Sequence, residues 1–391
     1  MKIPKRVHLL LERMEQEGYE AYLVGGCVRD EQRGEEPHDF DIATNATPRQ
    51  TMALFPDFPI IETGLQHGTV AVIIEHEPIE ITTYRIETTY SDHRHPDAVK
   101  FASSLQEDLS RRDFTINAMA MDKKGRLVDP FGGSEDLKAG LIRCVGEARQ
   151  RLSEDALRIL RALRFAARFG FSMEEKTKAA LFDCAPLLKK IAAERILAEL
   201  KGILVAPHAG EILAEYEPVL KEILPWLKSD CKVLRKLPPK ESLRFAGWLW
   251  PMGREAEALL KSLKASNALK NEAMLLIEGQ QISRPSRPMV RRLLARLGPA
   301  LYEDHLLLQE ALGRCSQEDG AWCRAAARAL IEEGACLSLK GLAIGGKELM
   351  ELGFSGAKIG KMQKRLFEEV MEEKLPNERE ALLEFAKKQE K

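Results

Sequence analysis

Asp39 and Asp41 are the residues whose types and spacing most clearly indicate chemistry in this chain of 391 residues. In a strand, residues i and i+2 point to the same face, so the two carboxylates would project side by side. Paired carboxylate oxygens suit Mg²⁺, which binds few protein carboxylates and completes its shell with water and substrate phosphates. The pair therefore predicts a metal-assisted phosphoryl or nucleotidyl transfer.

A glycine turn stands upstream of this pair. Gly25 and Gly26 follow the apolar run 21–24, which we interpret as a short buried strand. Glycine lets backbone N–H groups approach an anion closely, and Arg29 could add a planar donor fork to phosphate oxygens. Asp-x-Asp pairs also occur on solvated strand edges, and Gly-Gly is often only a turn. The two patterns so close together favour the interpretation as a site.

A third polar segment covers residues 111–118. Within it, Arg112 could reach a triphosphate. Asp113 and Asn117 are four residues apart and could bond each other or a ribose hydroxyl. An Arg–Asp pair that braces a helix start would give the same pattern, so the residues alone leave both interpretations open.

The strongest amphipathic pattern begins at Ser153, which we expect to cap a helix with acidic residues in its first turn. At about 100° per residue, apolar positions fall on one face and arginines on the other. The predicted buried face is Ala156, Ile159, Leu160, Leu163, Ala166 and Ala167, and the predicted polar face is Asp155, Arg158, Arg161, Arg164 and Arg168.

Asp155 and Arg158 lie one helical turn apart and could present a carboxylate and a guanidinium to the edge of a base. Cytosine and adenine each offer an amino donor beside a ring acceptor. Guanine and uracil place the wrong group opposite the carboxylate. The pair thus predicts that the protein itself selects C and A. The alternative is a solvated face whose ion pairs each contribute only about a few tenths of a kcal/mol.

The composition sets limits on the class of protein. The formal net charge is −1, so a surface that binds nucleic acid must be local. The seven cysteines form no Cys-x-x-Cys pair, which indicates neither a zinc site nor a disulfide framework. No apolar run approaches the length of a membrane span, and we expect a cytoplasmic protein without a membrane partner.

The elements that must position these residues differ between the two parts of the chain. Residues 1 to about 140 are mixed, with strands expected at 21–24, 40–43, 69–74, 79–84 and 127–128. From about residue 141 the strand signal almost disappears, and helical periodicity with Pro or Gly breaks dominates. We therefore predict an α+β chain in which a mixed-sheet domain precedes helical modules.

Further ordered stretches complete the pattern. In chain order the motifs are Gly25-Gly26-x-Val28-Arg29-Asp30, Asp39-x-Asp41, Arg111-Arg112-Asp113-Phe114-Thr115-x-Asn117-Ala118, Asp129-Pro130-Phe131-Gly132-Gly133, Glu154-Asp155-x-x-Arg158 and Glu194-Arg195-x-x-x-Glu199-Leu200. They resemble class II tRNA nucleotidyltransferases, the group of CCA-adding enzymes and bacterial poly(A) polymerases, and most closely the CCA-adding enzymes of Bacillus-type bacteria. The similarity covers the first 205 residues strongly and returns weakly near 345–379.

The resemblance implies an N-terminal nucleotidyltransferase head with a polymerase β-like mixed sheet, followed by all-α neck, body and tail. The corresponding domains are a catalytic head at 1–140, a neck for base recognition at 141–205, a body at 206–283 and a tRNA-binding tail at 284–391.

The resemblance also implies a role for each candidate residue. Asp39 and Asp41 would hold Mg²⁺, and Glu80 would be a third carboxylate that activates the acceptor hydroxyl. Two groups of residues would bind the nucleotide, one at the triphosphate and ribose and one at the base. The first group is Gly25, Gly26, Arg29 and Arg112, and the second is Asp155 and Arg158 with Arg161 and Arg164 in support.

The implied function is template-independent addition of C, C and A to the 3′ end of tRNA, with CTP and ATP as substrates and pyrophosphate as product. The nearest alternative is an enzyme that adds only A, to tRNA ending in CC or as a poly(A) polymerase. Residues 83–96 resemble the loop with which these enzymes switch from CTP to ATP, which favours completion of the terminal A.

Two alternatives come from other classes of protein. One is an RNA-binding module without activity, which the intact aspartate pair disfavours. The other is a nucleotidyltransferase that acts on small molecules, which the long helical half disfavours.

Three expectations concern residues outside the candidate site. His93 and His95 are expected to be solvated rather than to bind a metal. The tail is expected to hold the tRNA backbone through cations that position without reading sequence. The candidate cations are Lys358, Lys361, Lys364 and Arg365, and the tryptophans expected in the core are Trp226, Trp248, Trp250 and Trp322.

Overall fold

The structure, a computed structural model, describes residues 3–87, 99–102 and 104–390. The chain divides into two compact units, residues 1–227 with 261–265 and residues 228–260 with 266–391. Among the described residues, no helix is both long and apolar enough to cross a membrane. The fourfold division at residues 140, 205 and 283 stays a prediction.

The first unit contains a mixed sheet of seven strands in the order β3-β4-β5-β2-β1-β8-β9. All neighbours are antiparallel except β2 and β5, which run parallel. The strands are β1 (Ala21–Val24), β2 (Asp41–Thr44), β3 (Ile60–Ile61), β4 (Thr69–Ile74), β5 (Glu77–Thr83), β8 (Ala120–Met121) and β9 (Leu127–Val128). The strands expected at 21–24, 69–74 and 127–128 are confirmed, and those at 40–43 and 79–84 form with slightly shifted ends.

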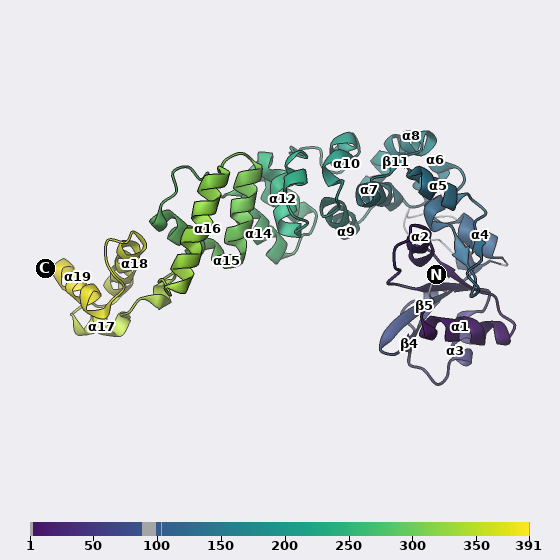
Figure 1. Cartoon of the computed structure of the whole chain (residues 1–391), viewed down its shortest axis with the longest axis horizontal. Coiled ribbons are helices and arrows are strands. Elements are labelled where there is room, and N and C mark those ends of the chain that lie inside the picture. Colours follow the sequence, from purple (N-terminus) through teal and green to yellow (C-terminus); the bar gives the residue numbers. More distant parts are fainter. Residues whose placement is uncertain (1–2, 88–98, 103, 391) are drawn as a thin grey trace. The chain divides into compact units, whose positions relative to one another are not determined.

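Helices α1 (Lys5–Gln16) and α3 (Pro48–Leu54) pack beside this sheet (Figure 1). The buried stripe of α1 is Val7, Leu10, Leu11 and Met14. Helix α3 begins with a capping box, because Thr47 and Gln50 satisfy each other's backbone N–H groups.

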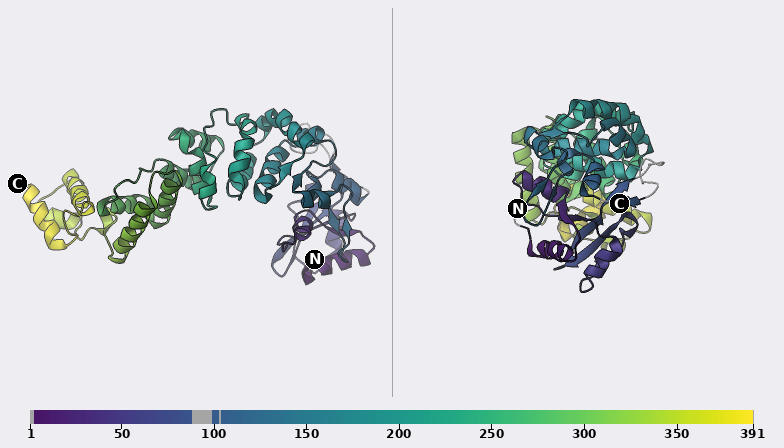
Figure 2. Two further views of the ribbon diagram at one scale, coloured as in Figure 1. Left: turned by 45° about the horizontal axis from the view of Figure 1, so that its top comes forward. Right: turned by 90° about the vertical axis from the view of Figure 1, so that its right-hand side faces the viewer.

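The other helices of this unit are α2 between strands β1 and β2, α4 before β8, and a series that follows the sheet. They are α2 (Gly26–Gln32), α4 (Leu105–Ser110), α5 (Gly133–Ala139), α6 (Ala148–Glu154), α7 (Leu157–Phe169), α8 (Glu175–Cys184), α9 (Ala193–Leu204), α10 (Ala209–Glu215) and α11 (Glu217–Lys221). Two short strand pairs accompany them, β6 (Arg85–Glu87) with β7 (Val99–Phe101) and β10 (Leu141–Ile142) with β11 (Ser172–Met173). Beyond these, Figure 2 shows only helices in the teal, green and yellow parts of the chain. The predicted α+β class is confirmed.

The predicted helix start at Ser153 is wrong. Ser153 lies in the last turn of α6, where its hydroxyl donates to the carbonyl of Gln150 at 2.9 Å. The chain becomes extended at Asp155 (φ −137°, ψ 102°), and α7 begins at Leu157. The predicted apolar face of α7 is confirmed, because Ala156, Ile159, Leu160, Leu163, Ala166 and Ala167 are all inaccessible to solvent.

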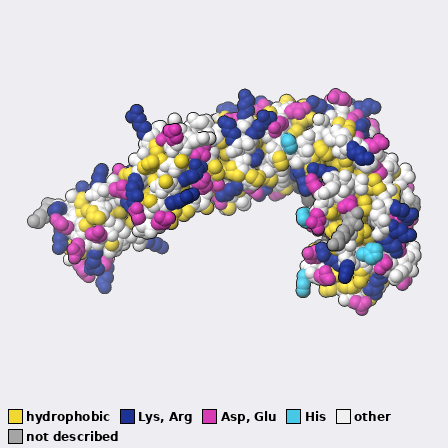
Figure 3. Space-filling view, viewed as in Figure 1, with side chains coloured by type: hydrophobic (Ala, Val, Ile, Leu, Met, Phe, Trp, Pro, Cys, Tyr) yellow, Lys and Arg dark blue, Asp and Glu magenta, His cyan; other side chains and the backbone are white. Residues whose placement is uncertain are grey.

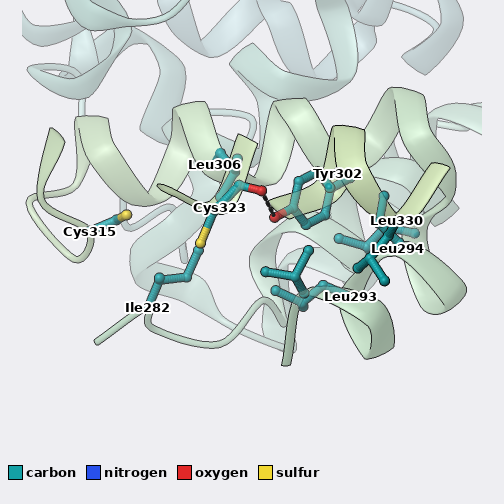
Figure 4. Packing of buried hydrophobic residues seen from close by; sticks show 11 residues of the cluster. Ile282, Leu293, Leu294, Tyr302, Leu306, Cys315, Cys323 and Leu330 are labelled. Atoms are coloured by element: carbon teal, nitrogen blue, oxygen red, sulfur yellow. Dashed lines mark hydrogen bonds between the residues drawn. The ribbon is translucent and has the colours of Figure 1, made fainter. Parts of the chain in front are cut away.

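The second unit is helical throughout its described residues. Its elements are α12 (Glu241–Leu249), α13 (Glu255–Ser262), α14 (Asn267–Ile277), α15 (Arg287–Ala311), α16 (Gln317–Glu332), α17 (Gly346–Glu351), α18 (Ala357–Met371) and α19 (Arg379–Glu390). Figure 4 shows a core cluster between α15 and α16 in which the Tyr302 hydroxyl donates to the carbonyl of Cys323 at 3.1 Å. A second cluster holds α17, α18 and α19 together.

The expectation that all four tryptophans are core residues is only partly right. Trp248 is fully buried, and Trp250 is half-buried with the Arg314 guanidinium 4.7 Å from its ring centroid. Trp226 and Trp322 are 50% and 44% exposed, so for these two the expectation is wrong. Apolar neighbours in sequence do not reveal which side of a short helix or turn faces solvent.

Candidate active site

The strand pairing of β2 with β5 brings Asp41 opposite Glu80. Asp39 lies just before β2. All three carboxylates line a cavity of about 510 Å³, called cavity B here, together with Arg6, His38, Phe40, Glu77, Pro78 and Ile79. Phe40 is only half-buried and faces this cavity rather than the core. The two aspartates thus line one cavity, as their spacing predicts, although only Asp41 lies within the strand. Their role as metal ligands stays a prediction.

The electrostatics at Asp41 are those of a crowded anionic site. The residue remains accessible to solvent, but protein atoms surround its carboxyl group. This desolvation, with Glu80 next in importance, raises the pKa of Asp41 to about 6, although Arg112 opposes the shift. A carboxyl group with a raised pKa beside other carboxylates gains from a bound cation.

A second cavity of about 490 Å³, called cavity A here, adjoins the same carboxylates. Asp41 and Glu80 line both cavities. Cavity A also brings together most of the predicted nucleotide-binding residues, namely Gly25, Gly26, Arg29, Arg112, Asp155, Arg158 and Arg161. Residues more than 100 positions apart in the sequence thus form one site.

Gly25 lines cavity A beside Arg112 and Asp41. Its φ of +74° is a conformation that favours glycine. A Cβ atom there would lie 3.3 Å from Arg112 Nη1 and 4.0 Å from Asp41 Oδ2. The missing side chain therefore leaves open the space between a cation and a carboxylate.

Arg112 is held by a buried carboxylate on α4. Asp108 accepts from Arg112 Nη2 at 3.2 Å and from Arg111 Nη2 at 2.7 Å. Burial alone would raise the pKa of Asp108, but these two guanidinium groups outweigh it and lower the pKa. Arg112 Nε is buried without a hydrogen-bond partner among the described residues. The Arg112 guanidinium as a whole lines cavity A.

Asp155 and Arg158 both line cavity A, and each forms a hydrogen bond with another side chain. Asp155 accepts from the backbone N–H of Leu157 at 3.0 Å and from Arg195 Nη2 at 3.0 Å. Arg158 donates to Glu154 Oε2 at 2.9 Å. Side-chain hydrogen bonds therefore fix the orientation of both groups.

Arg161 and Arg164 differ in their position. Arg161 donates from Nε and Nη2 to Asp113 Oδ2 at 2.9 and 2.7 Å. Arg164 pairs with Glu199 at 2.6 Å and does not line cavity A, so the structure does not bring it together with the other predicted nucleotide-binding residues. Burial alone would raise the pKa of Asp113, but Arg161 and Asn117 outweigh it and lower the pKa to about 2.

Sequence reasoning assigned no role to Arg195 or Phe165, which both line cavity A. Arg195 belongs to one of the recognised motifs, and its buried Nη1 has no hydrogen-bond partner among the described residues. Phe165 is 4% exposed and resembles any core residue of an amphipathic helix. Only its place beside the arginines, which depends on the fold, reveals it.

The motif Asp129–Gly133 supports the site indirectly. Asp129 accepts backbone N–H bonds from Gly133 and Ser134 at 2.8 and 2.9 Å at the start of α5. A Cβ atom on Gly133 would lie 2.2 Å from the carbonyl oxygen of Thr115. This close contact places α5 against the turn that carries Asn117.

Two further expectations concern the loop 83–96 and the binding of a metal ion. Most of the loop 83–96, with His93 and His95, lies outside the described residues. Within the described ranges, no group of three or more His, Cys, Asp or Glu side chains could by itself hold a metal ion. A metal bound at Asp39 and Asp41 would therefore depend on ligand oxygens from elsewhere.

Three family models match successive parts of the chain. The poly A polymerase head domain matches residues 21–143, the probable RNA and SrmB-binding site of polymerase A matches 170–230, and tRNA nucleotidyltransferase domain 2 matches 239–386. Together they cover the sheet domain and most of the helical part.

Two similar proteins are both named CCA-adding enzyme. The CCA-adding enzyme of Enterococcus faecalis is 36% identical over 97% of this chain and 95% of its own length. That of Leuconostoc mesenteroides is 50% identical over 52% of this chain and 50% of its own.

Two solved structures show the same fold. The Bacillus stearothermophilus CCA-adding enzyme in complex with CTP superposes with a TM-score of 0.85 at 30% identity, over 100% of this chain and 98% of that one. A tRNA nucleotidyltransferase complexed with a primer tRNA and an incoming ATP analog gives a TM-score of 0.65 at 27% identity, over 83% and 99%. The carboxylates, the glycine turn and the arginine-lined cavity thus stand in a chain that belongs to the family of CCA-adding enzymes and is a nucleotidyltransferase.

Proposed function

We propose that this protein adds C, C and A to the 3′ end of tRNA, using CTP and ATP and releasing pyrophosphate. The observation that carries this proposal is the convergence of the glycine turn, Asp41 with Glu80, and the pair Asp155 and Arg158 in cavity A. Relatives named for CCA addition, and related structures with CTP and with a primer tRNA, support the choice of substrates. Because tRNA maturation occurs in the cytoplasm, we infer that the enzyme acts there.

The nucleotide would lie in cavity A. Its triphosphate would occupy the space that Gly25 leaves open beside Arg112, whose Nη1 would meet a phosphate oxygen. Its base would face Asp155 and Arg158, with Arg195 beside them. An acceptor and a donor held rigidly by other side chains select C and A because the wrong base leaves them unpaired.

Nucleotidyltransferases of this family generally use a divalent metal ion, and we propose Mg²⁺. Asp39 and Asp41 would hold it, and the raised pKa of Asp41 supports the fit. When bound, the ion would acidify the acceptor hydroxyl and neutralise charge on the triphosphate and the departing pyrophosphate.

The acceptor would enter from cavity B, because cavity A is occupied by the nucleotide. Asp41 and Glu80 line both cavities, so a hydroxyl in cavity B would face the α-phosphate across them. We propose that Glu80 orients this hydroxyl and accepts its proton.

The second unit would hold the body of the tRNA through its backbone. Lys358, Lys361, Lys364 and Arg365 on α18 are all exposed, and three of them line a small cavity of about 280 Å³. On the face drawn in Figure 3, cations and acids alternate and form no continuous basic surface. Binding would therefore depend on local clusters such as this one.

The alternative is an enzyme that adds only A. The test supplies three tRNAs, lacking CCA, ending in C and ending in CC, each with CTP or ATP. We expect incorporation of C into the first two and of A into the third. Failure to add C to tRNA that lacks CCA would reject the proposal, and addition of A alone would establish the alternative.

A further inference from the structure

Five side chains in the first unit form a closed circuit. Arg29 Nη1 donates to Asn117 Oδ1 at 2.8 Å, Asn117 Nδ2 donates to Asp113 Oδ1 at 3.0 Å, and Asp113 Oδ2 accepts from Arg161 at 2.7 Å. The Phe165 ring closes the circuit, because the guanidinium carbons of Arg29 and Arg161 lie 5.4 and 5.6 Å from its centroid.

Four of the five members are buried, and the Arg161 side chain is 34% exposed. Arg29, Asp113, Asn117 and Phe165 are between 4% and 8% exposed. The remaining Arg29 donors Nε and Nη2 meet Asp30 at 2.9 and 2.7 Å. Hydrogen bonds and cation–π contacts of charged groups are stronger where water is excluded. Such a network restrains its members to one arrangement.

The circuit joins the two halves of cavity A. Arg29 lies on α2, which directly follows the glycine turn. Arg161 and Phe165 lie on α7, which carries Arg158 at its start. Asn117 and Asp113 belong to the segment between them that also supplies Arg112. The phosphate side and the base side of the site therefore meet through these five residues.

We propose that Asn117 and Phe165 are positioning residues that fix the separation between the glycine turn and the base-reading residues. This inference rests on the proposed function, because it assigns the two sides of cavity A to the two ends of one nucleotide. Asn117 uses its amide oxygen for Arg29 and its amide nitrogen for Asp113, so it acts through these residues. Arg29 likewise acts within the circuit, because its guanidinium is turned to Asp30 and Asn117.

The test uses the full-length enzyme with Mg²⁺ and measures CTP binding by calorimetry without any acceptor. Asn117→Ala removes the hydrogen bonds to Arg29 and Asp113. Phe165→Leu removes the aromatic ring but keeps an apolar side chain. Phe165→Tyr restores the ring. Asn45→Ala is the matched control, since Asn45 is an exposed asparagine of the same unit that accepts a backbone N–H bond from Glu20.

We expect Asn117→Ala to weaken CTP binding roughly tenfold, because it breaks hydrogen bonds to charged groups. Phe165→Leu should weaken it by a smaller factor, and Phe165→Tyr and Asn45→Ala should bind as wild type. The double variant that combines Asn117→Ala with Phe165→Leu should lose about as much CTP affinity as Asn117→Ala alone, since both changes open the same circuit. In the addition assay, incorporation of U and G relative to C should rise, with KM for tRNA unchanged.

Wild-type CTP affinity in a folded Asn117→Ala protein would overturn the inference. Fully additive losses in the double variant, or an equal rise in KM for tRNA, would also overturn it. A wild-type enzyme that binds CTP but adds no C to tRNA would instead refute the proposed function, and the binding measurements would still decide the circuit.

Discussion

The Asp41 carboxyl group, beside Asp39 and Glu80, concentrates negative charge where the chemistry is expected. We predict that Asp39→Ala and Asp41→Ala each abolish nucleotide incorporation, because the metal would lose a ligand. Binding of tRNA, followed by filter retention, should remain. Asp57→Ala, at a mostly exposed aspartate of the same unit, should be fully active. Retained turnover in both site variants would rule out the metal assignment.

A substitution at Gly25 tests whether the gap beside Arg112 is needed for nucleotide binding, apart from any strain that the new side chain causes in the backbone. Gly25→Ala should raise the nucleotide KM at least about tenfold, because a Cβ atom would fill the gap beside Arg112. The backbone at Gly25 (φ +74°, ψ −127°) lies in a region that favours glycine, so alanine there also costs stability. Gly34→Ala is the matched control, with φ +75° and nothing within 4 Å of the added atom. It should lower the melting temperature but leave KM unchanged. Equal KM values in the two variants would contradict the role of this gap.

Asp155 permits a test of base selection. Asp155→Ala removes the acceptor that Arg195 holds in place, so discrimination among the four nucleotides should fall roughly tenfold or more, whereas tRNA binding should change little. Competition between CTP and UTP on tRNA lacking CCA measures the ratio. Unchanged preference for C and A in a folded variant would exclude a base-reading role.

At the scale of residues, the sequence predicted which side chains belong to the site better than it predicted which side chains they contact. Spacing correctly grouped Asp39 with Asp41, and the hydrogen bond between Asp113 and Asn117 is one of the two alternatives that spacing left open. The contact between Asp155 and Arg195 joins residues 40 positions apart, one in the extended break between α6 and α7 and the other on α9. Local pattern carries no information on such pairs.

At the scale of elements, hydrophobic periodicity located helices and strands but not every end. The apolar pattern continues across the break between α6 and α7. The break arises because the Asp155 carboxylate accepts the N–H of Leu157 and is itself held by Arg195. A tertiary contact thus overrides local helix propensity, and the capping prediction at Ser153 fails for this reason.

Helix α15 carries a titratable group that predicts a pH effect on stability. Burial, with Arg296 next, lowers the pKa of His305 to about 4 from its ordinary 6.5. The folded state therefore favours neutral His305. Its contribution is complete above about pH 6.5 and is lost as the pH falls toward 4, by about 2 kcal/mol at pH 5.

Calorimetry of the full chain at pH 7.5 and pH 5 measures this effect. The wild type should lose stability between the two values, and His305→Gln should lose about 2 kcal/mol less. An identical pH dependence in the variant would show that His305 is not the titrating group. Since His305 lies far in sequence from the candidate site, nucleotide KM at pH 7.5 should not change.

At the scale of the whole molecule, we assign the nucleotide to the first unit and the body of the tRNA to the second. We predict that replacing Lys361 and Lys364 with Ala weakens tRNA binding and leaves nucleotide KM unchanged. The slope of log affinity against log salt should fall by about one for each phosphate that the variant no longer neutralises. Lys232→Ala, an exposed lysine of the same unit, is the control. An unaltered salt slope would remove this cluster from the tRNA interface.

The pairing of β2 with β5 has a consequence for the kinetics of refolding. Asp41 and Glu80 meet only through this parallel register, and a slip of one residue would turn Glu80 to the other face of the sheet. Helices form from local contacts, whereas such a non-local pair forms late. After dilution from denaturant, ellipticity should therefore recover before catalysis, so the return of activity would report when the last strands of the sheet have aligned.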